Sequence, residues 1–157
     1  YTGGFGADIS YKGFALNALF SFQADRWKNN SSLALIEDAS LASNLNVSTT
    51  MLDSWTTPGQ ITDMPGLAYG GLRAVSGDRY LEDASFLRLR NIALSYNVDK
   101  KVLEKTKVFT GVRVFVQGTN LVTWTKFRGF DPEGTTASAF FEYPVARTFS
   151  LGFDLTF

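Results

Sequence analysis

The chain has 157 residues, and its 15 basic side chains are balanced by 15 acidic ones, so charge gives no reason to expect nucleic acid as a partner. It has no cysteine and no histidine, which excludes a disulfide scaffold and argues against zinc sites and His-based general-base catalysis. Phe, Trp and Tyr make up 15% of the residues, a share that suits both soluble β-sandwiches and membrane barrels with aromatic girdles.

The first residues already follow an alternating pattern. The chain starts at YTGGFGADISY, without an initiator methionine or a signal-peptide pattern, so we expect it to be the carboxy-terminal segment of a longer protein. Phe5 and Ile9 share one side of this stretch, and the period of two predicts a strand over 3–12. A turn at 12–13 and a second alternating run predict a hairpin whose second strand covers 14–26.

The alternation stops after Trp27 and returns only near Tyr80. The residues between them form a connection over 27–79 that is rich in Asn, Ser, Thr and Gly, and a connection of this length is usually functional or disordered. A third strand is predicted over 80–98, and the short charged stretch that follows it predicts a turn over 99–110.

Two further strands are predicted over 111–126 and 145–157, on either side of a connection at 127–144. The final run, FSLGFDLTF, alternates without interruption over the nine residues 149–157, and a tilted strand needs about 9–11 residues to cross a bilayer. The run also reaches the end of the chain. We therefore expect strands long enough to span a membrane.

Short and long connections alternate along the chain, as they do in outer-membrane barrels. We therefore expect periplasmic turns at 12–13 and 99–110, and extracellular loops at 27–79 (long) and 127–144 (medium). The sequence predicts an all-β fold with five antiparallel strands of a transmembrane barrel. Since lipid does not tolerate an open sheet edge, other strands must complete the barrel.

In such a barrel one side of each strand faces lipid and the other faces a wet lumen. Arg88 and Arg90 share the phase of the apolar residue Ile92. We therefore expect both arginines on the lipid side, with Arg90 at the upper edge of the apolar band, where a charge costs about 0–1 kcal/mol. Asn120 also has the apolar phase, unless a bulge at Gly118 shifts it.

Aromatic residues gather near the ends of the predicted strands, as amphipathic rings do at membrane interfaces. The predicted belt at the short turns comprises Tyr11, Phe14, Tyr96, Phe109 and Phe157. The predicted belt on the long-loop side comprises Trp27, Tyr80, Trp124, Phe127 and Tyr143.

Four stretches resemble the end of a SusC/RagA-type TonB-dependent outer-membrane transporter. They are LDSWTTPGQITDMP, DRYLEDASFLRLRNIALSYNV, VRVFVQGTNLVTWTKFRGFDPE and YPVARTFSLGFDLTF, and with the opening hairpin they cover nearly the whole chain. The resemblance implies that residues 1–157 are the carboxy-terminal segment, with the last five strands, of a barrel of about 22 strands with a plugged lumen. The plug domain and the earlier strands would then lie outside this chain.

The resemblance also implies a function and partners. Members of this family import large nutrients, oligosaccharides or peptides, across the outer membrane of Gram-negative bacteria of the Bacteroidetes type. A SusD-like surface lipoprotein caps the barrel, the TonB complex supplies energy through the missing amino-terminal part, and the transporter–lipoprotein pairs form dimers. The barrel itself contacts outer-membrane lipid. No cofactor is implied.

Aromatic side chains in the long connections are candidate contacts for a ligand or a partner. Trp27, Trp55, Tyr69 and Tyr143 lie there, and their rings suit contact with the apolar surfaces of ligands. Loop packing, interfacial anchoring or contact with the lipoprotein is the simpler explanation.

The last strand carries a candidate signal for the barrel-assembly machinery. Phe153, Leu155 and Phe157 share one side of it, as strand addition to an exposed edge would require. The alternative for Phe157 is that its ring only anchors the strand at the membrane interface.

No catalytic or metal site is predicted. Asp38, Asp53 and Asp63 lack the spacing of a calcium loop, so we expect them to be solvated or to cap helices, and no nucleophile–base pair is recognisable. Two other function classes stay open: a soluble carbohydrate-binding β-sandwich module, and a structural surface or adhesin β-domain. A sandwich would pack the apolar sides of its strands against a second sheet instead of lipid.

Overall fold

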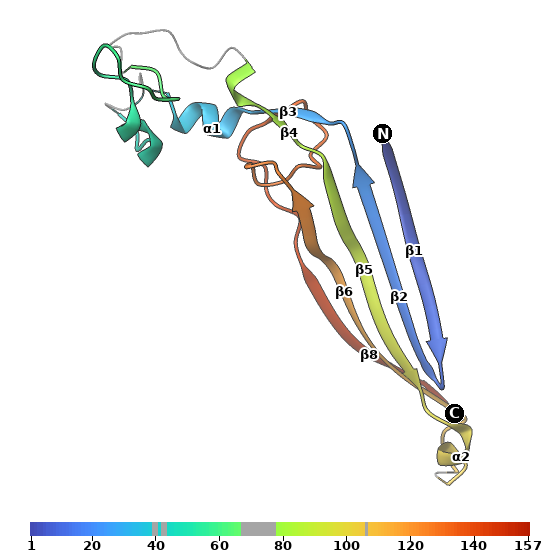
Figure 1. Ribbon diagram of the computed structural model, residues 1–157. Helices are drawn as coiled ribbons and strands as arrows, with labels where there is room; N and C mark the ends of the chain where they lie inside the picture. The colour runs from blue at the N-terminus through green and yellow to red at the C-terminus, as the bar shows by residue number, and fades with distance from the viewer. Residues whose placement is uncertain (39–40, 42–43, 67–77, 106) are drawn as a thin grey trace. The chain divides into compact units, whose positions relative to one another are not determined.

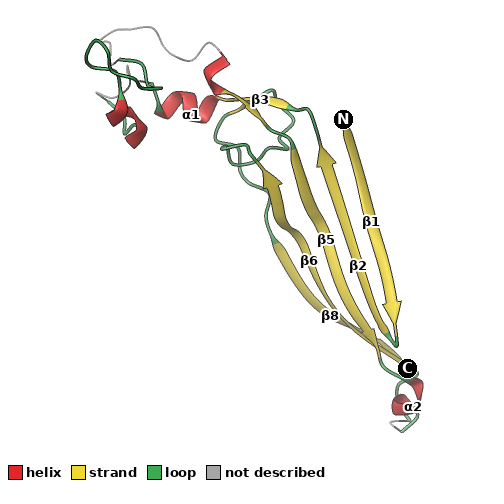
Figure 2. Cartoon of the chain, in the orientation of Figure 1, coloured by secondary structure: helices red, strands yellow, loops and turns green. Residues whose placement is uncertain are grey.

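The computed structural model describes residues 1–38, 41, 44–66, 78–105 and 107–157. Its strands are β1 (Thr2–Tyr11), β2 (Phe14–Gln23), β3 (Trp27–Asn30), β4 (Leu81–Asp83), β5 (Phe86–Asn97), β6 (Gly111–Thr125), β7 (Ser138–Ala139) and β8 (Thr148–Thr156). Short helical segments lie in the connections (Figures 1 and 2): α1 (Ser31–Ile36), η2 (Thr49–Asp53), η3 (Asp78–Tyr80) and α2 (Lys100–Leu103). None of the helices in the described ranges is long and apolar enough to cross a membrane.

The chain divides into two compact units. The sheet unit comprises Tyr1–Arg26, Ser85–Thr125 and Pro144–Phe157, and the loop unit comprises Trp27–Ala84 and Lys126–Tyr143. Each unit has a sheet of its own, and the sequence crosses between the units several times.

The sheet unit is one antiparallel sheet with the strand order β1-β2-β5-β6-β8 (Figure 1). The predicted all-β antiparallel fold is therefore confirmed. Lys12 and Gly13 connect β1 to β2 with φ angles of 46° and 86°, the left-handed conformations that a tight two-residue hairpin requires. The Asp99 side chain caps α2 in the connection from β5 to β6, where it accepts a hydrogen bond of 2.9 Å from the Lys101 backbone N–H.

One side of this sheet is apolar across all five strands. The register pairs Ile9 with Leu16, Leu16 with Leu94, Leu94 with Val116, and Val116 with Leu151. Because side chains alternate along a strand, this row and its neighbours of the same phase form one surface, which we call the apolar face.

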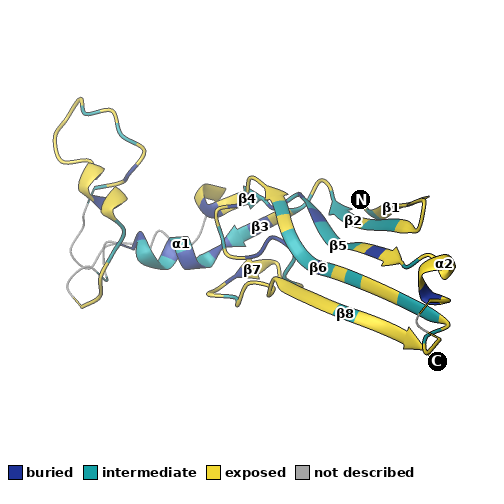
Figure 3. Ribbon diagram, turned by 90° about the horizontal axis from the view of Figure 1, so that it is seen from below, coloured by how far each residue is buried: buried dark blue, intermediate teal, exposed yellow. Residues whose placement is uncertain are grey.

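The apolar face is not covered by other parts of the sheet unit. None of the five residues in the row is buried, and on β8 Phe149, Leu151 and Phe153 are 74%, 79% and 70% exposed; Figure 3 shows β8 almost entirely in the colour of exposed residues. Within the described residues of the sheet unit, no second layer packs on this face. A sandwich, in which this face would be a core, is therefore not what the sheet unit forms.

The register of β5 shifts at Arg90, both in its pairing with β2 and in its pairing with β6. Phe20 pairs with Leu89 and Leu19 with Asn91, so Arg90 is an extra residue of β5 relative to β2. A bulge of this kind exchanges the two faces of a strand. In the part of β5 that precedes the bulge, Leu89 is therefore on the apolar face.

The same shift moves both arginines to the opposite side, which we call the polar face. Arg88 pairs with Ser21 and lies opposite Thr123, whose Oγ1 accepts a hydrogen bond of 2.9 Å from Arg88 Nε. Arg90 Nε donates to Ser21 Oγ at 2.7 Å. The prediction that these arginines lie on the lipid side is wrong, because simple alternation does not allow for the extra residue.

A second bulge accompanies the first, on β6. Leu89 pairs with Val122 and Asn91 with Thr119, so Arg90 alone faces two residues, Asn120 and Leu121. Asn120 has a φ of 53°, a left-handed conformation that Asn tolerates better than most residues. The sequence suggested a bulge at Gly118, and the structure has it two residues later, at Asn120.

The loop unit contains a smaller sheet with the order β4-β3-β7. Residues 81–83, expected as the start of the third long strand, instead form β4, which pairs antiparallel with β3, while β3 pairs in parallel with β7. Ala84, Phe127 and Ala139 form a buried apolar cluster. Phe127, like Tyr80, is therefore buried in the loop unit and does not belong to an exposed aromatic belt.

A partly buried ion pair joins two distant segments of the loop unit. Lys28, whose side chain is 0% exposed, lies with Nζ 2.7 Å from Glu142 Oε2, and the Phe127 ring lies 6.0 Å from the same Nζ. Thr136 Oγ1 also donates to Glu142 Oε1, at 2.8 Å. A Cβ on Gly134 would overlap the Glu142 carboxylate, so this glycine allows the close approach.

Candidate functional site

A chain of side-chain hydrogen bonds crosses the polar face of the wide sheet. Gln117 Nε2 donates to Asn91 Oδ1 at 2.6 Å, Asn91 Nδ2 donates to Asn17 Oδ1 at 3.1 Å, and Asn17 Nδ2 donates to Asp8 Oδ1 at 2.5 Å. The chain runs through β6, β5, β2 and β1, and it ends on a carboxylate, the strongest acceptor available. We call these four residues the amide ladder.

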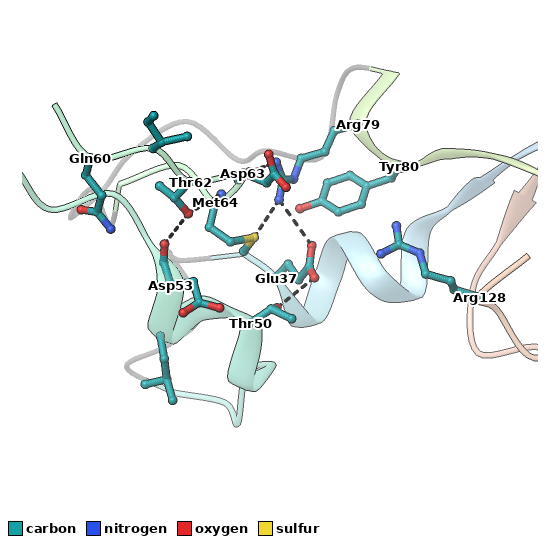
Figure 4. Close-up of a pocket in the computed structure, with 12 residues that line it drawn as sticks. Glu37, Thr50, Asp53, Gln60, Thr62, Asp63, Met64, Arg79, Tyr80 and Arg128 are labelled. Carbon is teal, nitrogen blue, oxygen red and sulfur yellow. Dashed lines mark hydrogen bonds and ion pairs between the residues drawn. The ribbon is translucent and has the colours of Figure 1, made fainter.

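The loop unit contains the second feature, a pocket of about 710 Å³ (Figure 4). Glu37 follows the end of α1 and is buried, and Thr50 Oγ1 donates to its Oε1 at 3.0 Å. Arg79 Nη2 lies 3.9 Å from Glu37 Oε2 and 2.7 Å from Met64 Sδ. The Arg79 guanidinium also lies 5.6 Å from the centre of the Tyr80 ring.

Local capping interactions place these side chains. Asn30 caps α1, because its Oδ1 accepts a hydrogen bond of 3.1 Å from the Leu33 backbone N–H. Ser48 caps η2 in the same way, by accepting a bond of 3.3 Å from the Thr50 N–H. The two caps fix where α1 and η2 begin, and so help to place Glu37, just after α1, and Thr50, within η2.

The hydroxyl of Tyr80 is the unusual group of the pocket. Tyr80 is 1% exposed, and its Oη has no hydrogen-bond partner among the described residues. Burial raises the pKa of this hydroxyl above its ordinary value, against the opposing effect of Arg79, so the group stays protonated and can donate. Buried hydroxyls nearly always have a partner.

Similarity to known proteins now decides the family. The TonB-dependent receptor P3 of Formosa agariphila is 33% identical to the chain over 169 residues, an alignment that covers 100% of the chain and 16% of that receptor. The chain belongs to the TonB-dependent receptor family. The TonB-dependent receptor SusC of Bacteroides thetaiotaomicron is 34% identical over 120 residues, which cover 74% of the chain and 12% of SusC. No protein-family model matches the chain.

Solved structures agree with this assignment. The RagAB peptide importer in its open-open state superposes with a TM-score of 0.89 and 34% identity, over 99% of the chain and 17% of the importer chain. Its closed-closed state gives a TM-score of 0.88. The SusC/RagA resemblance is therefore confirmed, and the chain spans only 12–17% of the length of these relatives. The relatives are receptors and transporters, which supports a non-enzymatic role at the level of the family.

The aromatic residues predicted as contacts do not form one site in this receptor segment. Trp27 begins β3 and is exposed, Trp55 is exposed after η2, and Tyr143 is 95% exposed. None of these three lines the pocket. Tyr69 lies outside the described residues. On β8, Phe153 and Leu155 lie on the apolar face, since they pair with Val114 and Val112, and Phe157, just beyond the strand, packs its ring 5.2 Å from that of Phe109.

Sequence reasoning missed the pocket and the partly buried ion pair. Their residues are far apart in the chain and follow no motif: Lys28 and Glu142 are separated by 114 residues. The ladder residues have the polar phase of their alternating strands, but only the strand register shows that they lie side by side. The described aspartates of the loop unit, Asp53 among them, form no group that could hold a metal ion.

Proposed function

We propose that this chain is the carboxy-terminal wall segment of an outer-membrane importer of the SusC/RagA type, in a Gram-negative bacterium of the Bacteroidetes type. One observation carries the proposal: the five-stranded sheet is apolar on one side and uncovered there by its own unit, while hydrogen-bonded polar groups cross the other side. Lipid contact outside and water inside require this combination.

The topology of the proposed barrel follows from the connections. The turn at 12–13 and the connection at 99–110 lie on the periplasmic side, and the connections at 27–79 and 127–144 are extracellular. The strands β1, β2, β5, β6 and β8 are then the last five of about 22, the strand number of plugged outer-membrane transporters. The remaining strands and the plug domain belong to the rest of the polypeptide.

Partners and cargo are proposed from the relatives. A SusD-like surface lipoprotein covers the extracellular side, the TonB complex drives transport through the plug, and two transporter–lipoprotein pairs form a dimer. The cargo is a large nutrient, either an oligosaccharide or a peptide. The names of SusC and of the RagAB peptide importer support this proposal. Trp27, Trp55 and Tyr143 then act as contacts for the vestibule or for the lipoprotein.

A matched pair of substitutions on β8 tests the membrane topology. In the full-length receptor, Leu151→Arg places a charge on the apolar face, at a cost of about 2–4 kcal/mol if that face meets the middle of the bilayer. Ser150→Arg places the same charge on the polar face, one residue away. We expect Leu151→Arg to lower the amount of heat-modifiable barrel in outer-membrane fractions and Ser150→Arg to leave it unchanged; equal effects contradict the proposal.

Transport is tested in cells. A strain that lacks the receptor is grown on single polysaccharides and on a peptide digest, with a strain that lacks TonB as the reference. We expect both strains to lose growth on the same nutrient and to regain it when the missing gene is restored. Growth of the receptor-deficient strain on every nutrient would exclude an essential import role.

The assembly signal is proposed at Phe153, Leu155 and Phe157. The full-length variant Phe157→Ala should reach the outer membrane in smaller amounts, because the assembly machinery loses a side chain that fills a pocket during strand addition. Phe149→Ala, on the same face of β8, is the control. A similar loss in both variants would indicate a general effect of removing an aromatic ring.

A further inference from the structure

The pocket of the loop unit has an acidic lining. Among the described residues that line it, Glu37, Asp53 and Asp63 carry carboxylates, and Arg79 and Arg128 carry guanidinium groups. Arg128 is already paired, because its Nη2 lies 2.7 Å from Glu82 Oε1 and its backbone N–H donates to Glu82 Oε2 at 3.0 Å.

Arg79 is the remaining cation of this lining, and its contacts are with Glu37, Met64 and the Asp63 backbone carbonyl. The carboxylates of Asp53 and Asp63 have no ion-pair partner in the part of the chain that the structure describes. In Figure 4 the labelled side chains of Glu37 and Arg79 meet beside Tyr80. Within the described lining, the pocket therefore has a negative charge that the arginines do not compensate.

The Tyr80 hydroxyl, which has no hydrogen-bond partner within the described ranges, is an independent indication of a ligand. Leaving a buried hydroxyl without a partner costs about 1–3 kcal/mol, and a bound polar group would remove this cost. The described lining has no exposed aromatic ring on which a sugar ring could stack, since Tyr80 is buried and Trp55 lies outside the lining. Charge and polar groups, the buried Tyr80 hydroxyl among them, are what the described lining offers to a ligand instead of stacking.

We propose that this pocket binds a primary ammonium group of the nutrient, with Asp53 and Asp63 supplying the opposite charge and the Tyr80 hydroxyl making a hydrogen bond to the neighbouring polar atoms of the ligand. The ammonium group belongs either to the amino terminus of a peptide or to an amino sugar. This inference rests on the proposed import function, because it assigns that function a ligand chemistry.

The test uses full-length receptor in detergent and isothermal titration calorimetry with four probes. Triglycine and glucosamine carry the ammonium group, and N-acetyl-triglycine and N-acetylglucosamine are their neutral-nitrogen counterparts. We expect acetylation to weaken binding by at least about tenfold for whichever probe binds, and we expect added salt to weaken binding of the charged probe. Binding by triglycine alone identifies a peptide site, and binding by glucosamine alone identifies an amino-sugar site.

Substitutions then locate the binding site. Asp53→Asn and Asp63→Asn should each weaken the charged probe by about tenfold, whereas Asp25→Asn, at an exposed position of the sheet unit, should not. Tyr80→Phe should weaken binding and leave the melting temperature unchanged or raised, because it removes an unpartnered hydroxyl. This combination separates a loss of ligand contact from a loss of folding.

The outcomes that overturn the inference are distinct from those that overturn import. Equal binding of free and acetylated probes, absence of binding by all four, or unchanged binding in the Asp53 and Asp63 variants excludes an ammonium site. Calorimetry in detergent does not need TonB. A receptor that still supports TonB-dependent growth but fails these titrations therefore loses only the ligand assignment.

Discussion

Lys28 Nζ and Glu142 Oε2 lie 2.7 Å apart and join two segments of the loop unit that are separated by 114 residues. The lysine side chain is fully buried, while that of the glutamate remains 24% exposed. Removing the carboxylate would leave the ammonium group without its principal acceptor in a place that water reaches poorly.

Glu142→Gln should therefore loosen the loop unit. We expect a loss of about 1.5–3 kcal/mol of local stability, the usual value of a hydrogen bond to a charged group. Hydrogen exchange of the Asn29 amide, which donates to the Ala137 carbonyl at 2.9 Å, measures this loss in the full-length receptor. Asp154→Asn is the control, because its pair with Arg113 is exposed and 3.9 Å long; such pairs contribute about 0–1 kcal/mol.

The same ion pair predicts a dependence on pH. Burial is the largest single influence on Glu142 and acts to raise its pKa, but the hydrogen bonds from Lys28 and Thr136 and the Lys28 charge together hold the pKa below its ordinary value of 4.5. A carboxyl whose pKa is lowered by folding stabilises the folded state above the unfolded pKa and loses this contribution as the pH falls through the folded pKa.

Protection of the Asn29 amide should thus stay constant from neutral pH down to about 5 and fall below the ordinary carboxyl pKa of 4.5. Hydrogen exchange corrected for its intrinsic pH dependence measures this. In Glu142→Gln the pH-dependent part should disappear; a variant with the same acid transition would assign the effect to another carboxyl.

The amide ladder predicts a cost for interrupting its centre. Asn91 accepts from Gln117 and donates to Asn17, so Asn91→Leu removes two hydrogen bonds and leaves two amides without these partners. We expect a cost of about 1–3 kcal/mol, seen as a lower temperature for the loss of the compact barrel band in electrophoresis. Asn97→Leu makes the same change on the same strand and face, where the side chain is exposed, and should have little effect.

The positive φ of Asn120 restricts which residues can replace it. At its φ of 53°, a β-branched residue is strongly disfavoured, at about 1–2 kcal/mol or more, whereas Gly adopts this conformation freely. Asn120→Val should therefore lower the melting temperature of the barrel, and Asn120→Gly should not. Thr119→Val, next to it but without a positive φ, serves as the control. Equal tolerance of both Asn120 variants would mean that the bulge moves to another residue.

The long strands could be predicted from the sequence because their pattern is local. Each of β1, β2, β5, β6 and β8 alternates over many residues, and the boundaries in the structure differ from the expected ones by only a few positions at most ends. The faces of Arg88 and Arg90 could not be predicted, because the extra residue Arg90 inverts the alternation of β5. No glycine or proline in β5 marks this bulge.

The loop unit was beyond sequence reasoning for another reason. Its strands β3, β4 and β7 have four, three and two residues, too few for a periodic signal. Asn29 pairs with Ser138 across more than a hundred residues. Tyr80 illustrates the consequence: its place near a strand end suggested an interfacial ring, but the structure buries it beside Arg79 and Glu37.

The two adjacent bulges at Arg90 and at Asn120–Leu121 have a mechanical consequence. Extra residues bend a strand and increase its twist, and a single sheet can close on itself only if it is curved. The irregularity that turns two guanidinium groups to the polar face therefore also curves the sheet, as closure of a barrel requires.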